Sequence, residues 1–384
     1  MKICKEDVKE VSDSNPLHTR SLYETLYEIF LPHNFPHSVH DPDSYLKYQL
    51  FDTLQGLCSY LRGALSMRGI LKATTLISLS SNSSVDSIVL TWLLRDGISL
   101  ISSLLFTTIF SPSPSPRFSF SSHLKEFRLF ADFINDVGMT LDLLLPICPN
   151  QYLLIMTLSG VCKTLCGVCA SVTKPLITNH FTKTKTGNQA DLNAKENSQE
   201  TFVTLLGLAL GALLTKLTES ESDNENENEN DVRVEMFIFL TLTFLHLIFN
   251  WIGVRALHLR TLNYQRISII RREGRLLTPR EVGERESFIF ALRELFFGRE
   301  LEVGAGGFAK AFSEGELTLC NERILCVEKG GRKKIFLHRC ATDLDAINAC
   351  LNFKINALEE LSCVGWELDP LQFLAGTKRV SYEL

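Results

Sequence analysis

Five apolar stretches, each long enough to cross or nearly cross a bilayer, restrict the fold of this chain more than any other feature. A transmembrane helix needs about 20 mostly apolar residues, because the hydrocarbon core of a bilayer is about 30 Å thick. The stretches are residues 86–110, 130–147, 151–172, 202–217 and 235–254. We therefore predict a mainly α protein with a multi-pass helical membrane domain, and a soluble helical bundle is the alternative.

Two of the five stretches carry charged residues, which are costly inside a membrane. Arg95 and Asp96 lie near the middle of the first stretch, and Asp132, Asp136 and Asp142 lie in the second. A buried helix of a large soluble core is therefore the alternative for each of these two stretches.

The loops between the stretches alternate between basic and non-basic. Basic residues accumulate on the cytoplasmic side of short loops. Bases follow the first, third and fifth stretches, whereas the loop after the second has none and the loop after the fourth has only Arg233 beside an acidic run. This alternation predicts five crossings, with the C-terminal region in the cytoplasm or an equivalent compartment. The organelle is not indicated.

A further apolar segment, residues 49–79, precedes the first stretch. Its apolar residues recur at helical spacing, but Arg62, Arg68 and Lys72 interrupt it. This pattern predicts an interfacial or buried amphipathic helix, with a sixth crossing as the alternative.

The chain divides into four regions by composition. A polar tail covers residues 1–27, and the helical membrane domain covers 28–259 with a disordered acidic loop at 218–233. A basic connecting helix follows at 260–285, and a soluble α+β domain covers 286–384. In that domain we expect an amphipathic helix at 286–297, strands at 316–320, 323–328 and 334–338, and a helix that begins after Thr342.

Cysteine usage and charge exclude several classes of protein. The 11 cysteines are scattered singly, which favours reduced thiols over a secreted disulfide framework. Cys162, Cys166 and Cys169 have a spacing known from iron–sulfur sites, but they lie on an apolar helix, where small residues favour close packing. The net charge of −5 gives no indication of nucleic acid, because residues 219–231 alone hold seven acids. We expect no metal, cofactor or nucleic-acid partner.

Two polar clusters are candidate sites. Arg128, Asp132 and Asp136 recur at every fourth residue, and with Arg95 and Asp96 they form either a structural ion-pair network or a ligand path. The second cluster lies on one helical face leading into the fourth stretch and comprises Asn188, Asp191, Lys195, Ser198 and Gln199. Its hydrogen-bonding groups exceed what a helix cap needs.

These clusters also carry a family resemblance. The segments WLLRDGISLISSLLF, LKEFRLFADFINDV and NQADLNAKENSQET resemble, in this order, the domain of the root UVB sensitive family. FLPHNFPHSVHDPDSYLKYQLFDTLQ, LHLRTLNYQR and the later GWELDPLQFLAGTKR are also similar to that family. The resemblance runs from about Glu28 to the C-terminus, and NQADLNAKENSQET is its most specific piece.

The resemblance implies a eukaryotic membrane protein linked to UV-B responses and vitamin B6 homeostasis, whose members act in paired complexes. We expect a non-enzymatic membrane scaffold or adaptor, with the lipid bilayer and a protein, such as a paralogous family member, as partners. The alternative is a transporter or channel for a small polar solute that uses the Arg/Asp network. An enzyme of vitamin B6 chemistry would need a Schiff-base lysine beside a phosphate cup, and no glycine-rich cup adjoins Lys195.

Overall fold

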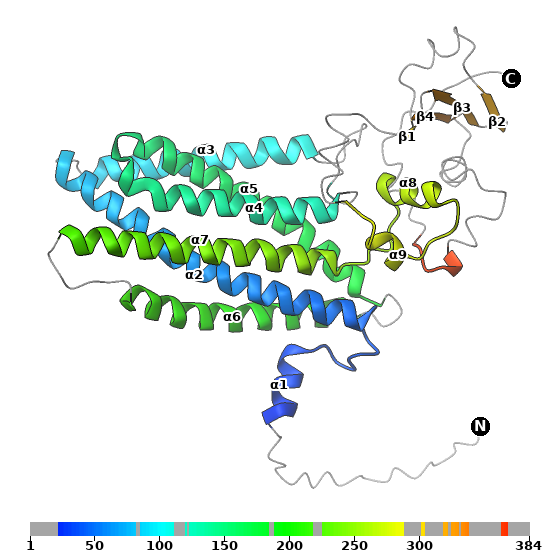
Figure 1. Cartoon of the computed structure of the whole chain (residues 1–384), viewed down its shortest axis with the longest axis horizontal. Helices are drawn as coiled ribbons and strands as arrows, with labels where there is room; N and C mark the ends of the chain where they lie inside the picture. The colour runs from blue at the N-terminus through cyan, green and yellow to red at the C-terminus, as the bar shows by residue number, and fades with distance from the viewer. Residues whose placement is uncertain are drawn as a thin grey trace, which may run out of the picture.

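The fold is taken from a computed structural model of the chain, which describes most of residues 22–287 and parts of the region that follows (Figure 1). The described ranges are 22–81, 85–110, 120, 123–183, 188–217, 225–287, 301–303, 318–321, 324–329, 332–337 and 362–367.

Six long helices lie side by side in a bundle (Figure 1). Consecutive helices run in opposite directions. The helices are α2 (Pro42–Ser81), α3 (Val85–Phe110), α4 (Leu124–Leu144), α5 (Tyr152–Phe181), α6 (Gln189–Leu217) and α7 (Glu225–Arg255). The short helix α1 (Leu22–Phe30) packs against α6, and two 3-10 turns, Leu145–Ile147 and Pro149–Gln151, join α4 to α5.

Helix α2 occupies the centre of the bundle. It packs against α4, α6 and α7, while α5 packs between α3 and α4. With 40 residues it is about 60 Å long, which exceeds the thickness of a bilayer core. The segment predicted as an interfacial or buried amphipathic helix is therefore a buried central one, whose polar face meets α4 and α7.

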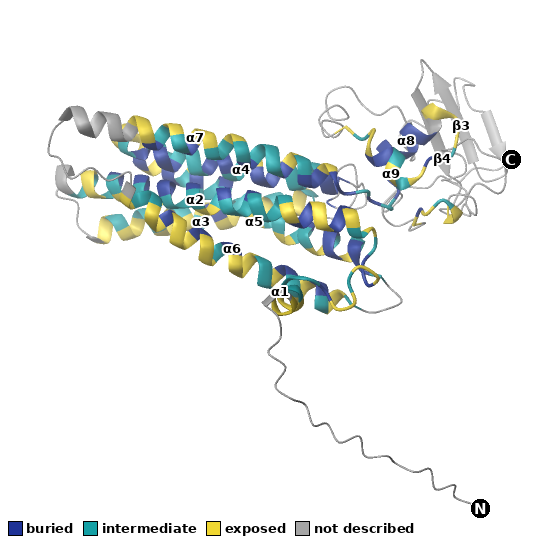
Figure 2. Cartoon of the chain, turned by 60° about the horizontal axis from the view of Figure 1, so that its bottom comes forward, coloured by how far each residue is buried: buried dark blue, intermediate teal, exposed yellow. Residues whose placement is uncertain are grey.

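Among the residues that the structure describes, four helices are long and apolar enough to cross a membrane, rather than the five stretches predicted from sequence. They cover Asp86–Phe110, Pro149–Phe181, Gln189–Lys216 and Arg233–Arg255. The second predicted stretch falls on α4, whose three aspartates point into the bundle and are buried. Many large apolar residues of α3, α6 and α7 are exposed. Exposed residues are yellow along these helices in Figure 2.

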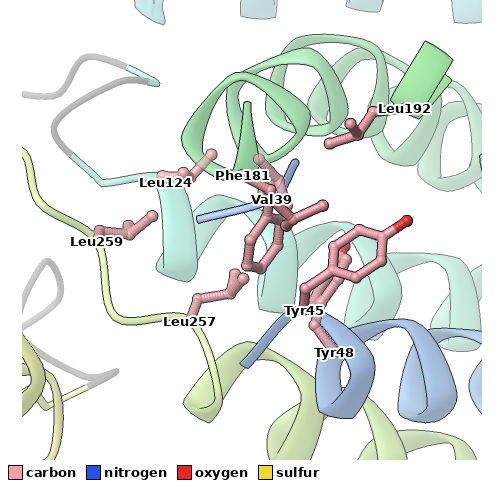
Figure 3. Close-up of a cluster of buried hydrophobic side chains, with 9 residues drawn as sticks. Val39, Tyr45, Tyr48, Leu124, Phe181, Leu192, Leu257 and Leu259 are labelled. Atoms are coloured by element: carbon pink, nitrogen blue, oxygen red, sulfur yellow. The ribbon is translucent and has the colours of Figure 1, made fainter. Parts of the chain in front are cut away.

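A hydrophobic cluster closes the end of the bundle at which α2, α4 and α6 begin (Figure 3). Because Lys125, Lys183, Arg255 and Arg260 lie at this end, we call it the basic end. The cluster joins four helices of the bundle to the adjoining chain, since its members come from α2, α4, α5, α6, the segment before α2 and the segment after α7. They are Val39, Tyr45, Tyr48, Leu124, Ile177, Phe181, Leu192, Leu257 and Leu259.

The region after α7 differs from the predicted basic helix at 260–285. The chain leaves α7 at Arg255, and two shorter helices follow, α8 (Tyr264–Glu273) and α9 (Pro279–Gly283). Gly274 ends α8 with a φ of 65°, a conformation that glycine adopts without a side-chain clash. Thr278 and Glu281 form a capping box that starts α9. Helix α7 also begins earlier than predicted, so it includes much of the acidic segment assigned to a disordered loop.

Four strands are described in the C-terminal region, namely β1 (Leu301–Val303), β2 (Thr318–Asn321), β3 (Ile324–Lys329) and β4 (Arg332–Leu337). They form a sheet in the order β1-β4-β3-β2, with β1 parallel to β4 and the other pairs antiparallel. Strands β2 to β4 begin and end within two residues of the predicted strands. The helices predicted at 286–297 and after Thr342 lie almost entirely outside the described residues, so the α+β domain as a whole stays a prediction.

Candidate functional site

A partly open cavity of about 300 Å³, lined by many polar side chains, lies between helices of the bundle near the basic end. Helices α2, α5 and α6 form its walls, and α4 contributes Arg128. Tyr48 and Ile177 belong both to its lining and to the hydrophobic cluster in Figure 3, so the cluster borders the cavity. Its charged lining residues are Asp52, Arg128, Lys174, Glu196 and Glu200.

Two ion pairs connect helices that line this cavity. Arg128 Nη2 lies 2.7 Å from Asp52 Oδ1, and Lys174 Nζ lies 2.6 Å from Glu200 Oε1. The remaining carboxylate, Glu196, accepts hydrogen bonds from Thr178 Oγ1 at 2.7 Å and Gln49 Nε2 at 3.3 Å. Side chains that can form hydrogen bonds thus line several sides of the cavity, which suits it to a polar molecule.

A row of buried polar groups continues from the cavity into the bundle. Gln55 lines the cavity, and its Nε2 lies 3.3 Å from His246 Nε2 on α7. The other ring nitrogen, His246 Nδ1, lies 3.1 Å from Asp136 Oδ2. Asp136 Oδ1 accepts a hydrogen bond of 2.5 Å from Arg62 Nη1. These contacts link α2, α4 and α7 at one level of the bundle.

The same row reaches the opposite end of the bundle. Asp142 accepts a hydrogen bond of 2.9 Å from Ser66 Oγ and pairs with Lys163 of α5. Glu235 of α7 pairs with Arg68 at 2.5 Å and with Lys72 at 3.3 Å. From the cavity to Lys72 the row follows α2 for roughly 35 Å, at 1.5 Å per residue. This length is comparable to the thickness of a bilayer core, about 30 Å.

The structure brings together only part of the Arg/Asp network predicted from sequence. Arg128 Nε lies 3.8 Å from Asp132 Oδ2, as the spacing predicted, although its nearer carboxylate is Asp52. Arg95 and Asp96 do not join this network. They pair with each other at 2.7 Å on α3, and the Arg95 guanidinium lies over the Trp92 ring. The grouping of all five residues is therefore wrong, because Arg95 lies against Gly160 of α5, whereas α3 meets α4 farther along, through Phe106 and Phe110.

Four residues of the site, Asp52, Arg62, Glu196 and His246, were not selected from the sequence. A signal for the first two was present, since Gln49, Asp52, Gln55, Ser59, Arg62 and Ser66 recur at spacings of three and four on one face of α2. Glu196 lies within the most specific family segment, and His246 lies among apolar residues in the fifth apolar stretch. Neither indicates by itself which helix it faces.

The second predicted cluster holds a segment of the chain itself. Four of its members contact main-chain atoms of residues 28–38, which we call the strap. Asn188 donates to Ser38 O at 2.7 Å, Lys195 to Glu28 O at 2.5 Å and Gln199 to Phe30 O at 2.7 Å. Asp191 Oδ2 accepts from the His33 amide at 2.8 Å.

Ser198, the fifth member, instead bonds to Ala194 O on its own helix. The surplus of hydrogen-bonding groups on this face therefore satisfies the backbone of the strap.

At the basic end, an ion-pair cluster joins the bundle to the chain after α9. Glu286 contacts Lys125 of α4 and lies 2.5 Å from Arg266 Nε of α8, and both partners are buried. Burial raises the pKa of Glu286, but the charges of Arg266 and Lys125 outweigh this effect and hold the pKa below its usual value. The region after α7 is thus held against the first turn of α4.

The cysteine motif on α5 packs as predicted. Cys162 and Cys169 are buried, and a Cβ added to Gly138 of α4 would lie 3.1 Å from Cys162 Cβ. Small residues therefore allow α4 and α5 to approach closely here.

Comparison with known proteins identifies the family of the chain. A family model described as "Vitamin B6 photo-protection and homoeostasis domain" matches residues 16–273, which is more than half of the chain. The chain belongs to the root UVB sensitive family. The family model ends at the last residue of α8, so it covers the six-helix bundle together with the cavity and the strap.

Relatives in this family come from plants and an amoeba. The chain is 34% identical to "Protein root UVB sensitive 3" of Arabidopsis thaliana over 272 residues, or 70% of this chain and 57% of the relative. It is 32% identical to "RUS family member 1" of Dictyostelium discoideum over 71% of this chain and 49% of the relative. "Protein root UVB sensitive 2, chloroplastic" of Arabidopsis thaliana is 25% identical over 77% of this chain and 64% of the relative.

The chain therefore spans about half to two thirds of the length of these relatives. No solved structure shows significant similarity to it.

Proposed function

We propose that this family member is an integral membrane protein that binds a small polar solute in the cavity and moves it across the membrane. The observation that carries the proposal is the cavity of about 300 Å³, lined by charged and hydrogen-bonding side chains, between helices with apolar outer faces. Ionisable groups at membrane depth are expensive and commonly mark solute pathways. The volume lies at the lower end of the range for small-molecule pockets.

The row of buried polar groups supports transport rather than storage of the solute. It leads from the cavity along α2 to Glu235, close to the opposite end of the bundle. We propose that this row forms part of a path through the protein. We also propose that each of the six helices of the bundle crosses the membrane once.

We also propose that the basic end faces the cytoplasm, in agreement with the loop charges. In this arrangement the C-terminal region is cytoplasmic.

A membrane scaffold or adaptor is the second candidate function. The buried contacts of Glu286 with Lys125 and Arg266 support it, because they hold the region after α7 against the bundle, where a partner protein could bind both. A paralogous family member as partner, and the absence of catalysis, remain part of this proposal. The printed names of the family model and the relatives also lead us to propose a role in UV-B responses and vitamin B6 homeostasis.

Membrane insertion gives the first prediction. The four long apolar helices carry outward-facing leucines and phenylalanines that would need lipid as their solvent. After alkaline carbonate extraction of cell membranes, we expect more than about nine tenths of the protein in the pellet, as for other multi-span proteins. Release into the supernatant would show that the protein is peripheral or soluble, and a peripheral protein from the same membranes serves as control.

Solute transport gives the second prediction. Phenylalanine at Ser59 would fill the cavity without removing a charge, because Ser59 lies in its lining. Proteoliposomes with the wild-type protein should take up at least one component of a defined mixture of amino acids, polyamines and B6 vitamers. Ser59→Phe should reduce that uptake about tenfold or more, because displacing bound solute removes most of its binding energy.

Ser171→Phe is the matched control, since Ser171 lies exposed on the outer side of α5. It should transport like the wild type. Uptake by Ser59→Phe at the wild-type rate would exclude the cavity as the route, and no uptake by the wild type would contradict transport.

A further inference from the structure

The cavity contains one more carboxylate than base. Its charged lining residues are three carboxylates and two bases, so their formal charges sum to −1. Arg128 pairs with Asp52, and Lys174 pairs with Glu200. The remaining charge belongs to Glu196, which forms no ion pair within 4.0 Å with any residue that the structure describes.

Glu196 is also deeply buried, with only 6% of the residue exposed. Thr178 and Gln49 donate neutral hydrogen bonds to its two oxygens, which orient the carboxylate but do not neutralise it. A buried carboxylate without a cation is unfavourable, because the interior does not solvate its charge as water does. The site therefore lacks a positive charge that a bound molecule could supply.

The surroundings of Glu196 favour an organic cation over a metal ion. Calcium and magnesium require six or more oxygen ligands, usually including several carboxylates or waters. The other two carboxylates of the cavity are already paired with bases. Tyr48 and Tyr60 line the same cavity, and the faces of tyrosine rings attract ammonium groups.

We infer that the cavity takes a small solute with a protonated amine, and that Glu196 is the counter-ion of that amine. This inference rests on the proposed function, since it names the chemical class of the solute for the same cavity. The polar lining on the other walls then accommodates the uncharged or zwitterionic remainder of the molecule.

Equilibrium dialysis of the full-length protein in detergent tests the inference. The probes are amines paired with hydroxyl analogues of similar shape: pyridoxamine with pyridoxine, ethanolamine with ethylene glycol, putrescine with 1,4-butanediol, and alanine with lactate. We expect at least one amine to bind about tenfold or more tightly than its analogue, as a hydrogen bond to a charged group predicts. Glu196→Gln should remove this preference, because it should weaken binding of the amine and leave the affinity for the hydroxyl analogue unchanged.

Two further variants distinguish a lost contact from a lost fold. Glu196→Asp keeps the charge and should keep the preference for the amine, even where its affinity is lower. Asp96→Asn removes a carboxylate from α3, outside the cavity, and should bind like the wild type. Thermal unfolding and size-exclusion chromatography establish that each variant is folded before its binding is compared.

The outcomes separate this inference from the proposed function. If probes bind but no amine binds more tightly than its hydroxyl analogue, or if folded Glu196→Gln keeps the preference, the inference is wrong while solute binding stands. If neither the amines nor their analogues bind to the wild type, both the inference and the proposed function fail.

Discussion

Replacement of Arg62 by leucine is expected to lower the free energy of unfolding by about 3–5 kcal/mol, the typical cost of removing one partner of a buried ion pair. Arg62 is fully buried at the centre of α2 and donates to Asp136 at 2.5 Å. Without the guanidinium, the Asp136 carboxylate would keep only its contact with His246 in an otherwise apolar bundle. We expect most of the variant to be misfolded or degraded in cells.

The double variant Arg62→Leu with Asp136→Asn should recover much of this loss, because it removes both charges together. Replacing a whole buried pair is often close to neutral, so we expect a coupling energy of about 2 kcal/mol or more in the double-mutant cycle. Denaturant unfolding in micelles, with protein abundance in cells as a second measurement, gives the four values of the cycle.

Arg280→Leu is the control for this cycle, because Arg280 is exposed and lies 4.0 Å from Glu284. Its effect should stay within about 0.5 kcal/mol. Additive losses for Arg62→Leu and Asp136→Asn would show that the two side chains do not interact.

Alanine at Gly69 is expected to destabilise the bundle by about 1–3 kcal/mol, which is the usual cost of overpacking a protein interior. A Cβ at this position would lie 2.8 Å from the carbonyl oxygen of Asp142 and 3.1 Å from Leu143 Cα. Both atoms belong to the backbone of α4, so they cannot move aside by a change of rotamer. Relief would require α2 and α4 to separate, which would disturb the buried contacts around Asp142.

Gly63→Ala on the same helix is the matched control. A Cβ at Gly63 would meet no atom within 4 Å, so only the helix propensity changes. Alanine should therefore stabilise the protein by about 1 kcal/mol at this position. Thermal unfolding of the two variants should shift the midpoint in opposite directions, and a stabilising effect of Gly69→Ala would show that the two helices are not in close contact there.

Several features of the fold followed directly from local sequence pattern. The apolar stretches predicted the cores of α3, α5, α6 and α7, and strands β2 to β4 lie within two residues of the predicted ones. The family segments also identified the family that the comparison shows. These features depend on composition and periodicity over about 10 to 20 neighbouring residues, which a single sequence displays in full.

The ends of the helices were harder to predict from the local sequence pattern. The basic segment after α7 reads as one helix by composition, yet Gly274 and the capping box at Thr278 divide it into α8 and α9. The acidic segment before α7 reads as disordered, yet the helix begins at Glu225. Local interactions at caps and neighbouring helices outweigh composition at such boundaries.

The assembly of the site was decided by helix packing. Periodicity placed Arg128, Asp132 and Asp136 on one face of α4, and the structure confirms that this face is buried. It could not show that Arg62, 74 residues away, is the base that pairs with Asp136. Nor could it show that Arg95 pairs with its own neighbour Asp96.

The physical reason lies in what a helical repeat specifies. The 3.6-residue period tells which side chains share a face, but the partner of that face depends on the order and rotation of the helices around α2. Glycines such as Gly69 set that arrangement by allowing close contact between particular pairs of helices. Contacts between distant segments therefore formed the cavity around Glu196, and only the tertiary structure placed an uncompensated carboxylate there.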